Sequence, residues 1–140
     1  MCGIVGGVTN KNITPLLLAG LNRLEYRGYD SSGLIVLSPK NSFDRARSVG
    51  KVSNLEKNLK SRTKEINGNI GIAHTRWATH GEPSSTNAHP HISKNTVSVV
   101  HNGIIENYVE LKNSQIKQGY LFKSETDTEV IAHAIDFEMQ

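Results

Sequence analysis

The chain has 140 residues, of which 36% are hydrophobic and 21% are charged, and its net charge is +3. This length and composition are typical of one soluble globular domain. The basic residues form no run, which argues against nucleic-acid binding, and no apolar run is long enough to span a membrane. A single cysteine cannot form an internal disulfide, so we expect a reducing, cytoplasmic location.

The first three residues, Met1-Cys2-Gly3, contain the only cysteine of the chain. Removal of Met1 would leave a thiol and a free α-amine on the same residue. A terminal α-amine has an ordinary pKa near ~8 and can act as the general base for its own nucleophile, as in hydrolases with an amino-terminal threonine. The alternative is that Cys2 is a small buried apolar residue without a chemical role.

The apolar pattern predicts about six strands and about four helices. Short apolar or alternating runs predict strands at residues 3–8, 33–37, 43–49, 70–73, 96–100 and 120–122. Helical spacing predicts helices that begin at Thr14, Ser53, Asn107 and Thr126. Neighbouring strands that resemble hairpins favour antiparallel pairing, and therefore an α+β fold over a doubly wound parallel sheet.

Two of the predicted helix starts carry specific capping signals, and the last predicted helix has no stop signal. Ser53 and Glu56 form a Ser-x-x-Glu capping box, and the helix that they open is expected to run to about Ile66. The last helix is expected to be capped by Thr126-Asp127. It meets no Gly, Pro or polar tail before the sequence ends, so we expect a fragment of a longer protein.

Asn102-Gly103 follows a predicted strand. If Cys2 attacks a carbonyl, an Asn side-chain amide and the next backbone N–H could donate hydrogen bonds to the oxyanion. The alternative is an ordinary turn, because Asn-Gly is the commonest short hairpin signal. Against that alternative, residues 104–107 lead into a helix instead of a second strand.

The segment 74–81, HTRWATHG, places an arginine, threonines and histidines at the end of a buried strand. The planar guanidinium of Arg76 could bind a substrate carboxylate in bidentate fashion. The alternatives are a surface salt bridge for Arg76 and a core aromatic for Trp77.

Acidic, histidine-rich and loop segments supply further candidates. The carboxylate of Asp127, in Glu125-Thr126-Asp127, could hold a substrate ammonium, although helix capping is an equal alternative. Residues 26–33 could form a loop over a site, or an ordinary helix-to-strand loop. Six histidines invite a metal hypothesis, but without an HExxH motif or a cysteine cluster we expect no metal.

Six ordered blocks carry a resemblance to a known family. They are MCGIVG, LEYRGYDSSG, GIAHTRWATHG, NAHPH, VHNGIIEN and SETDTEVIAH. Together they resemble the class II glutamine amidotransferases, and in particular the branch that transfers glutamine nitrogen to fructose 6-phosphate. The resemblance covers nearly the whole chain and is weakest at residues 38–68.

The resemblance implies an amino-terminal-nucleophile fold, an α-β-β-α sandwich of two antiparallel sheets. It makes Cys2 the nucleophile after removal of Met1, with its own α-amine as the base. The Asn102 side chain and the Gly103 N–H would form the oxyanion hole.

The resemblance also implies how glutamine is held. Arg76 would bind the carboxylate of glutamine, helped by Thr79 and His80. Asp127 would bind the glutamine ammonium.

The resemblance has further implications for the full-length protein. Trp77 would gate the route of ammonia, and Arg27 would lie in a loop that closes the glutamine site. Residues 1–140 would be a glutaminase domain truncated at its C-terminus, with the sugar-isomerising part absent. L-glutamine would be the partner here and fructose 6-phosphate only in the full-length protein, which we expect to be a homo-oligomer without a cofactor. Another class II amidotransferase, or a silent glutamine-sensing module, stays open.

Overall fold

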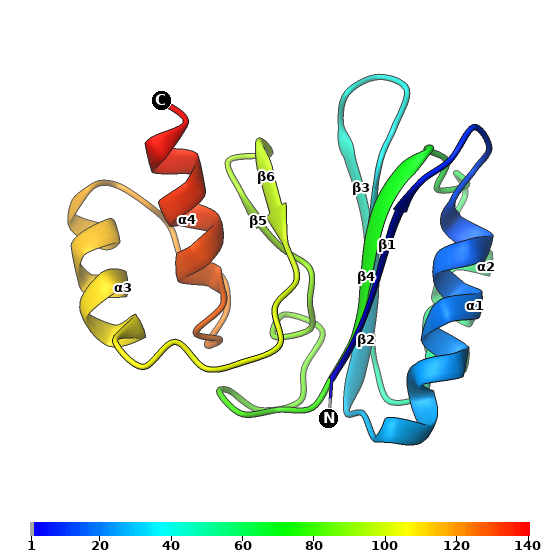
Figure 1. Cartoon of the computed structure of the whole chain (residues 1–140), viewed down its shortest axis with the longest axis horizontal. Helices are drawn as coiled ribbons and strands as arrows, with labels where there is room; N and C mark the ends of the chain where they lie inside the picture. Colours follow the sequence, from blue (N-terminus) through cyan, green and yellow to red (C-terminus); the bar gives the residue numbers. More distant parts are fainter. Residues whose placement is uncertain (1) are drawn as a thin grey trace.

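The structure, a computed structural model, describes residues 2–140, so the expected removal of Met1 lies outside the described residues. It has helix, sheet, sheet and helix layers in that order (Figure 1). The α-β-β-α sandwich of antiparallel sheets that the resemblance implied is therefore confirmed. None of the helices formed by residues 2–140 combines the length and apolar character that a membrane span requires.

The larger sheet has four strands in the order β1-β4-β2-β3, and every pairing is antiparallel. Its strands are β1 (Gly3–Val8), β2 (Ser31–Leu37), β3 (Phe43–Val49) and β4 (Ile70–Arg76). The second sheet is the antiparallel pair β5 (His91–Ser93) and β6 (Val97–Val99). Because β1 pairs with β4, the first strand delivers the amino-terminal end of the described chain to the end of β4.

Helices cover the outer face of each sheet (Figure 1). The larger sheet is covered by α1 (Thr14–Leu24), which continues into the 3₁₀-helix η1 (Glu25–Arg27), and by α2 (Val52–Lys60). The smaller sheet is covered by α4 (Glu129–Glu138), and α3 (Tyr108–Lys117) packs on α4. Pro15 stands in the first turn of α1, where its fixed φ favours the helix, and Gly28 ends η1 with a positive φ of 87°.

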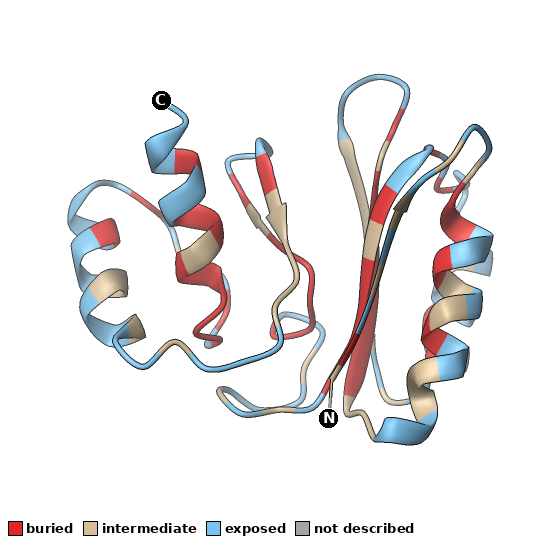
Figure 2. Cartoon of the chain, in the orientation of Figure 1, coloured by how far each residue is buried: buried red, intermediate tan, exposed pale blue. Residues whose placement is uncertain are grey.

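The main core lies between α1, α2 and the larger sheet. Leu17 and Leu21 of α1 pack with Leu34 and Val36 of β2, and all four are fully buried. Strand β2 is buried along almost its whole length, because α1 and α2 cover one face and the rest of the sandwich covers the other (Figure 2). A strand covered on both faces reads as a continuous apolar run, which is why residues 33–37 predicted it.

The helix predicted from Ser53 differs from the prediction at both ends. It begins at Val52 after Lys51, so Ser53 lies inside the first turn and the predicted capping box is wrong. It ends at Lys60 instead of near Ile66. The backbone carbonyl of Ile66 accepts hydrogen bonds from the side chains of Asn12 and Thr14, which hold this residue against the start of α1.

The predicted strand at residues 120–122 is absent from the described chain. There the Tyr120 hydroxyl donates to Asp136 of α4 at 2.8 Å, and Leu121 is exposed, so side chains hold the segment instead of a strand ladder. Strand β5 was not predicted, because three residues with two polar side chains give no apolar run. The last helix begins at Glu129 and not at Thr126, and its N-cap makes no side-chain hydrogen bond.

Candidate active site

Cys2 lies where β1 meets the end of β4. Gly3 pairs with Thr75 in the sheet register, and the Gly3 N–H donates to the buried Thr75 hydroxyl at 3.0 Å. The backbone N–H of Trp77 donates to Cys2 Sγ at 3.1 Å, and the thiol lies 3.7 Å from the Trp77 carbonyl oxygen. The cysteine side chain is therefore fixed by the backbone just after β4.

Asn102 lies beside Cys2. Its side-chain Nδ2 donates to the Cys2 carbonyl oxygen at 3.1 Å, although 100 residues separate the two in sequence. Its Oδ1 is 2.7 Å from His74 Nε2. In the described chain, no strand follows between Gly103 and α3, so Asn102-Gly103 is not the turn of a β-hairpin.

A cavity of about 230 Å³ opens next to Cys2. Seven of the nine predicted site residues line it: Cys2, Arg76, Trp77, Thr79, His80, Gly103 and Asp127. The other two are Asn102, which contacts Cys2, and Arg27, which is exposed in η1. A larger cavity of about 560 Å³ lies elsewhere, beside Arg45 and Arg47. Neither Cys2 nor Asn102 lines it, so we place the chemistry in the smaller cavity.

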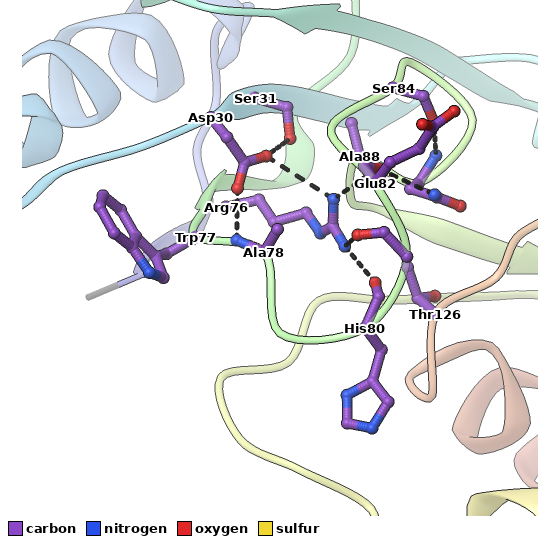
Figure 3. A network of polar contacts seen from close by, with 12 residues as sticks. Asp30, Ser31, Arg76, Trp77, Ala78, His80, Glu82, Ser84, Ala88 and Thr126 are labelled. Atoms are coloured by element: carbon purple, nitrogen blue, oxygen red, sulfur yellow. Dashed lines mark hydrogen bonds and ion pairs between the residues drawn. The ribbon is translucent and has the colours of Figure 1, made fainter.

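Arg76 is only 3% exposed, so the alternative of a surface salt bridge is wrong. Its guanidinium donates to the backbone carbonyl oxygens of His80, of Gly81 at 3.1 Å and of Glu82 at 3.3 Å. It also lies 3.6 Å from the Asp30 carboxylate (Figure 3). Arg76 thus shapes the loop that follows β4 while facing the cavity, and Asp30 balances its charge.

Asp30 is a site residue that the sequence reasoning missed. Its carboxylate accepts hydrogen bonds from the Ala78 N–H and from the Ser31 hydroxyl, the latter at 2.9 Å (Figure 3). Its own N–H donates to the Arg76 carbonyl oxygen at 2.7 Å. Asp30 therefore ties the loop at 26–33 to the segment at 74–81. The available signal was that Asp30 is the only acid in that loop.

Trp77 is 54% exposed, so the alternative of a core aromatic is wrong. Its side chain points away from Arg76 (Figure 3). The ring lies against Gly28, where an added Cβ would come within 2.8 Å of it. The indole thus packs on the loop that contains Arg27, at the rim of the cavity.

Asp127 is buried, with 3% exposure, and faces the cavity instead of capping α4. Its Oδ2 accepts a hydrogen bond from the Ile105 N–H at 2.7 Å, and its Oδ1 lies 3.9 Å from His80 Nδ1. Glu125 has a different role, because its carboxylate accepts a hydrogen bond from the buried Asn87 side chain at 2.9 Å. Of the two acids, Asp127 is the one available to a ligand in the cavity.

Three buried histidines pack together at the cavity, and two of them, His74 and His89, line it. The rings of His74 and His89 stack at 4.1 Å with an interplanar angle of 12°, and His91 meets His89 edge-on at 4.7 Å. Burial lowers the pKa of His74 to about 4 and that of His91 to about 3, and it lowers the pKa of His89 well below the ordinary 6.5. All three imidazoles are therefore neutral near pH 7. Across residues 2–140, no group of three or more His, Cys, Asp or Glu side chains is arranged to hold a metal ion.

The fold is that of the amino-terminal-nucleophile amidotransferases. A glutamine phosphoribosylpyrophosphate amidotransferase from B. subtilis, solved with ADP and GMP, superposes with a TM-score of 0.71 at 27% identity, covering 96% of this chain and 28% of that one. A structure described as the allosteric regulatory enzyme of purine biosynthesis gives a TM-score of 0.72 at 28% identity, covering 96% and 29%. A family model described as a glutamine amidotransferase domain matches residues 45–138, and the chain belongs to this family.

Comparison with curated relatives indicates one branch of this family. The chain is 57% identical, over 99% of its length, to a glutamine–fructose-6-phosphate aminotransferase (isomerizing) of Buchnera aphidicola subsp. Baizongia pistaciae. It is 55% identical, over 100% of its length, to the protein of that name from Haemophilus influenzae, and 58% identical over 96% to the one from Pseudomonas putida. The chain spans only 22% of the length of each of these relatives.

Proposed function

We propose that this chain is the glutaminase part of an isomerizing glutamine–fructose-6-phosphate aminotransferase. It would hydrolyse the side-chain amide of L-glutamine to glutamate and ammonia. Identities of 55–58% to three relatives with that name, against 27–28% to the two solved amidotransferase structures, favour fructose 6-phosphate as the eventual acceptor over another one. Residues 1–140 would then form part of the glutaminase domain, and the sugar-isomerising part would lie outside this chain.

One observation carries this proposal: the only cysteine meets an amide donor in a cavity. Cys2 Sγ accepts a hydrogen bond from the Trp77 N–H, and the Cys2 carbonyl accepts one from the Asn102 side chain. These contacts span 75 and 100 residues of sequence. An isolated buried cysteine would need neither contact, and an isolated Asn-Gly turn would not lie beside a thiol.

In the proposed reaction, removal of Met1 frees the α-amine of Cys2, which accepts the thiol proton. The thiolate attacks the side-chain carbonyl carbon of glutamine, and the carbonyl π-electron pair moves to oxygen. The Asn102 Nδ2 and the Gly103 N–H donate hydrogen bonds to that oxyanion. The intermediate collapses, the C–N bond breaks, and the ammonium on Cys2 returns the proton to the leaving ammonia.

The same residues complete the cycle. The product of the first half is a γ-glutamyl thioester on Cys2. A water molecule gives a proton to the free amine while its oxygen attacks the thioester carbonyl, and the second oxyanion uses the same donors. Collapse breaks the C–S bond, glutamate leaves, and the proton on the amine returns to sulfur.

The charges around the cavity suit the head group of an amino acid. Arg76 is a buried cation and Asp127 a buried anion, and both line the cavity that contains Cys2. A zwitterion could place its carboxylate at Arg76 and its ammonium at Asp127. Thr79 and His80 line the same cavity, and we propose that they support these contacts.

Trp77 and Arg27 would act in closure and ammonia transfer. The exposed Trp77 ring packs on Gly28, next to Arg27. A movement of the loop at 26–33 would therefore change how far the entrance of the cavity beside Cys2 is covered. The acceptor site would come from the part of the relatives that this chain does not span. We further propose that the full-length protein is a homo-oligomer.

Intact mass and a glutaminase assay on the full-length protein test the proposal together. The mass reports whether Met1 has been removed, and the assay reports glutamate and ammonia. We expect processed protein to be active and protein that retains Met1 to be inactive, because an amide nitrogen is not a base. Processed, folded protein that binds glutamine without turnover would instead indicate the silent sensing module.

A further inference from the structure

We infer that His74 is a positioning residue that fixes the side-chain amide of Asn102 with its donor toward Cys2. This inference rests on the proposed function, because it concerns the oxyanion donor of that reaction. His74 lies on β4, is 1% exposed, and lines the cavity on the side of Asn102.

The partners of His74 determine which ring nitrogen carries the proton. Nε2 lies 2.7 Å from Asn102 Oδ1 and 3.2 Å from the His101 carbonyl oxygen. Both oxygens can only accept, so Nε2 must be the donor. The other nitrogen, Nδ1, is buried and has no hydrogen-bond partner in the described part of the chain. A protonated Nδ1 would leave a buried donor unsatisfied, so the neutral Nε2–H tautomer is the favourable one.

This tautomer selects one orientation of the Asn102 amide. With Oδ1 facing Nε2–H of His74, Nδ2 faces the Cys2 carbonyl oxygen, to which it donates at 3.1 Å. A flipped amide would set its NH₂ group against the imidazole N–H and its oxygen against the carbonyl oxygen of Cys2. Both contacts would then be repulsive.

Packing does not provide this selection. Asn102 is an exposed residue, and the terminal torsion of an asparagine side chain is broad and roughly two-fold. The imidazole, by contrast, is held firmly. His74 stacks on His89, and His89 Nδ1 accepts the backbone N–H of His101 at 3.4 Å. The rigid imidazole of His74 thus fixes the orientation of the Asn102 side-chain amide, which would otherwise rotate.

The charge state of His74 also suits this role. Its pKa is lowered to about 4, chiefly by burial; the hydrogen bonds to Asn102 and His101 oppose this shift, and the nearby charges of Arg76 and His101 add to it. The ring is therefore a neutral, single donor across the pH range of the proposed reaction.

The test compares variants of the full-length protein that remove or keep the donor. His74→Leu and His74→Met fill the space without an N–H, whereas His74→Gln retains a side-chain N–H. We expect each donor-free variant to lower kcat by about 10- to 100-fold with KM nearly unchanged, because a misaimed donor costs less than a lost one. His74→Gln should recover most of kcat. Thermal unfolding monitors the fold of every variant, and two donor-free variants allow for a folding defect in one.

A double-mutant cycle separates positioning from a merely structural role. If His74 acts through Asn102, then His74→Leu combined with Asn102→Ala should be no slower than Asn102→Ala alone. Independent, multiplying losses would overturn the inference, as would wild-type kcat in both folded donor-free variants. In both of these outcomes the wild-type protein still hydrolyses glutamine, so the proposed function would stand. A processed wild-type protein without glutaminase activity would instead overturn the proposed function, and this inference with it.

Discussion

Replacing Asn102 by alanine tests the proposed oxyanion hole directly. The side chain makes two hydrogen bonds, from Nδ2 to the Cys2 carbonyl oxygen at 3.1 Å and from His74 Nε2 to Oδ1 at 2.7 Å. Its loss should leave the fold intact, because Asn102 is exposed and the N–H of His74 keeps the His101 carbonyl oxygen as an acceptor at 3.2 Å. The cost should therefore fall on catalysis.

The expected magnitude follows from what the donor contacts in each state. Removing one preorganised oxyanion donor costs about 100- to 1000-fold in kcat, or about 3–4 kcal/mol of transition-state stabilisation. Because the oxyanion forms only after attack, KM should change little. The Gly103 N–H would remain as the second donor, so activity should fall without vanishing.

Steady-state glutaminase kinetics on purified full-length protein provide the measurement. Asn113→Ala is a matched control, because Asn113 is also exposed but lies on α3 away from the cavity. It should retain wild-type kcat and KM. A raised KM with unchanged kcat in Asn102→Ala would refute the reasoning, since it would make Asn102 a binding residue.

Three further predictions follow from the same structure. Cys2→Ala should abolish glutamine hydrolysis in folded protein and Cys2→Ser should retain weak activity, because an alcohol is a far poorer nucleophile at neutral pH; wild-type turnover by Cys2→Ala would end the mechanism. If Arg76 binds the glutamine carboxylate, Arg76→Ala should raise KM at least 10-fold in the same steady-state kinetics that are used for Asn102→Ala. An unchanged KM would contradict that role. Stability should fall as pH drops below 6.5. The folded pKa of His74 is about 4 and that of His91 about 3, so the unfolded chain binds more protons in this range. His74 alone should account for about 2 kcal/mol by pH 5. A melting temperature that stays constant from pH 7 to pH 5 would contradict the burial of neutral histidines.

Local patterns in the sequence predicted the strands and helices that face a core. Continuous apolar residues predicted β2, because a strand that is buried on both faces has an apolar run. The alternation at 43–49 predicted β3, because a strand that is buried on one face alternates apolar and polar residues. The start of α1 followed from Thr14-Pro15. The end of α2 did not follow, because the Ile66 carbonyl is held by side chains from a distant segment.

The site was predictable to the extent that the resemblance covered it. The residues named for catalysis and glutamine binding gather around one cavity, although their chemical roles remain proposals. Asp30 and His74 were missed as supporting residues. Each acts through a contact between separate segments, Asp30 with Ala78 across 48 residues and His74 with Asn102 across 28. No periodicity or short motif reports such a contact.

The strand order of the larger sheet has a consequence during protein synthesis. Strand β1 is made first, but its sheet neighbour β4 begins at Ile70, about 60 residues after β1 ends. At about 5–20 residues per second, the ribosome needs on the order of 3–12 s to make the intervening chain. Throughout this interval the nascent β1 has no sheet partner, and the cavity around Cys2 does not yet exist. If Met1 is removed as we propose, an aminopeptidase would meet an open terminus during translation, before the sandwich folds around Cys2.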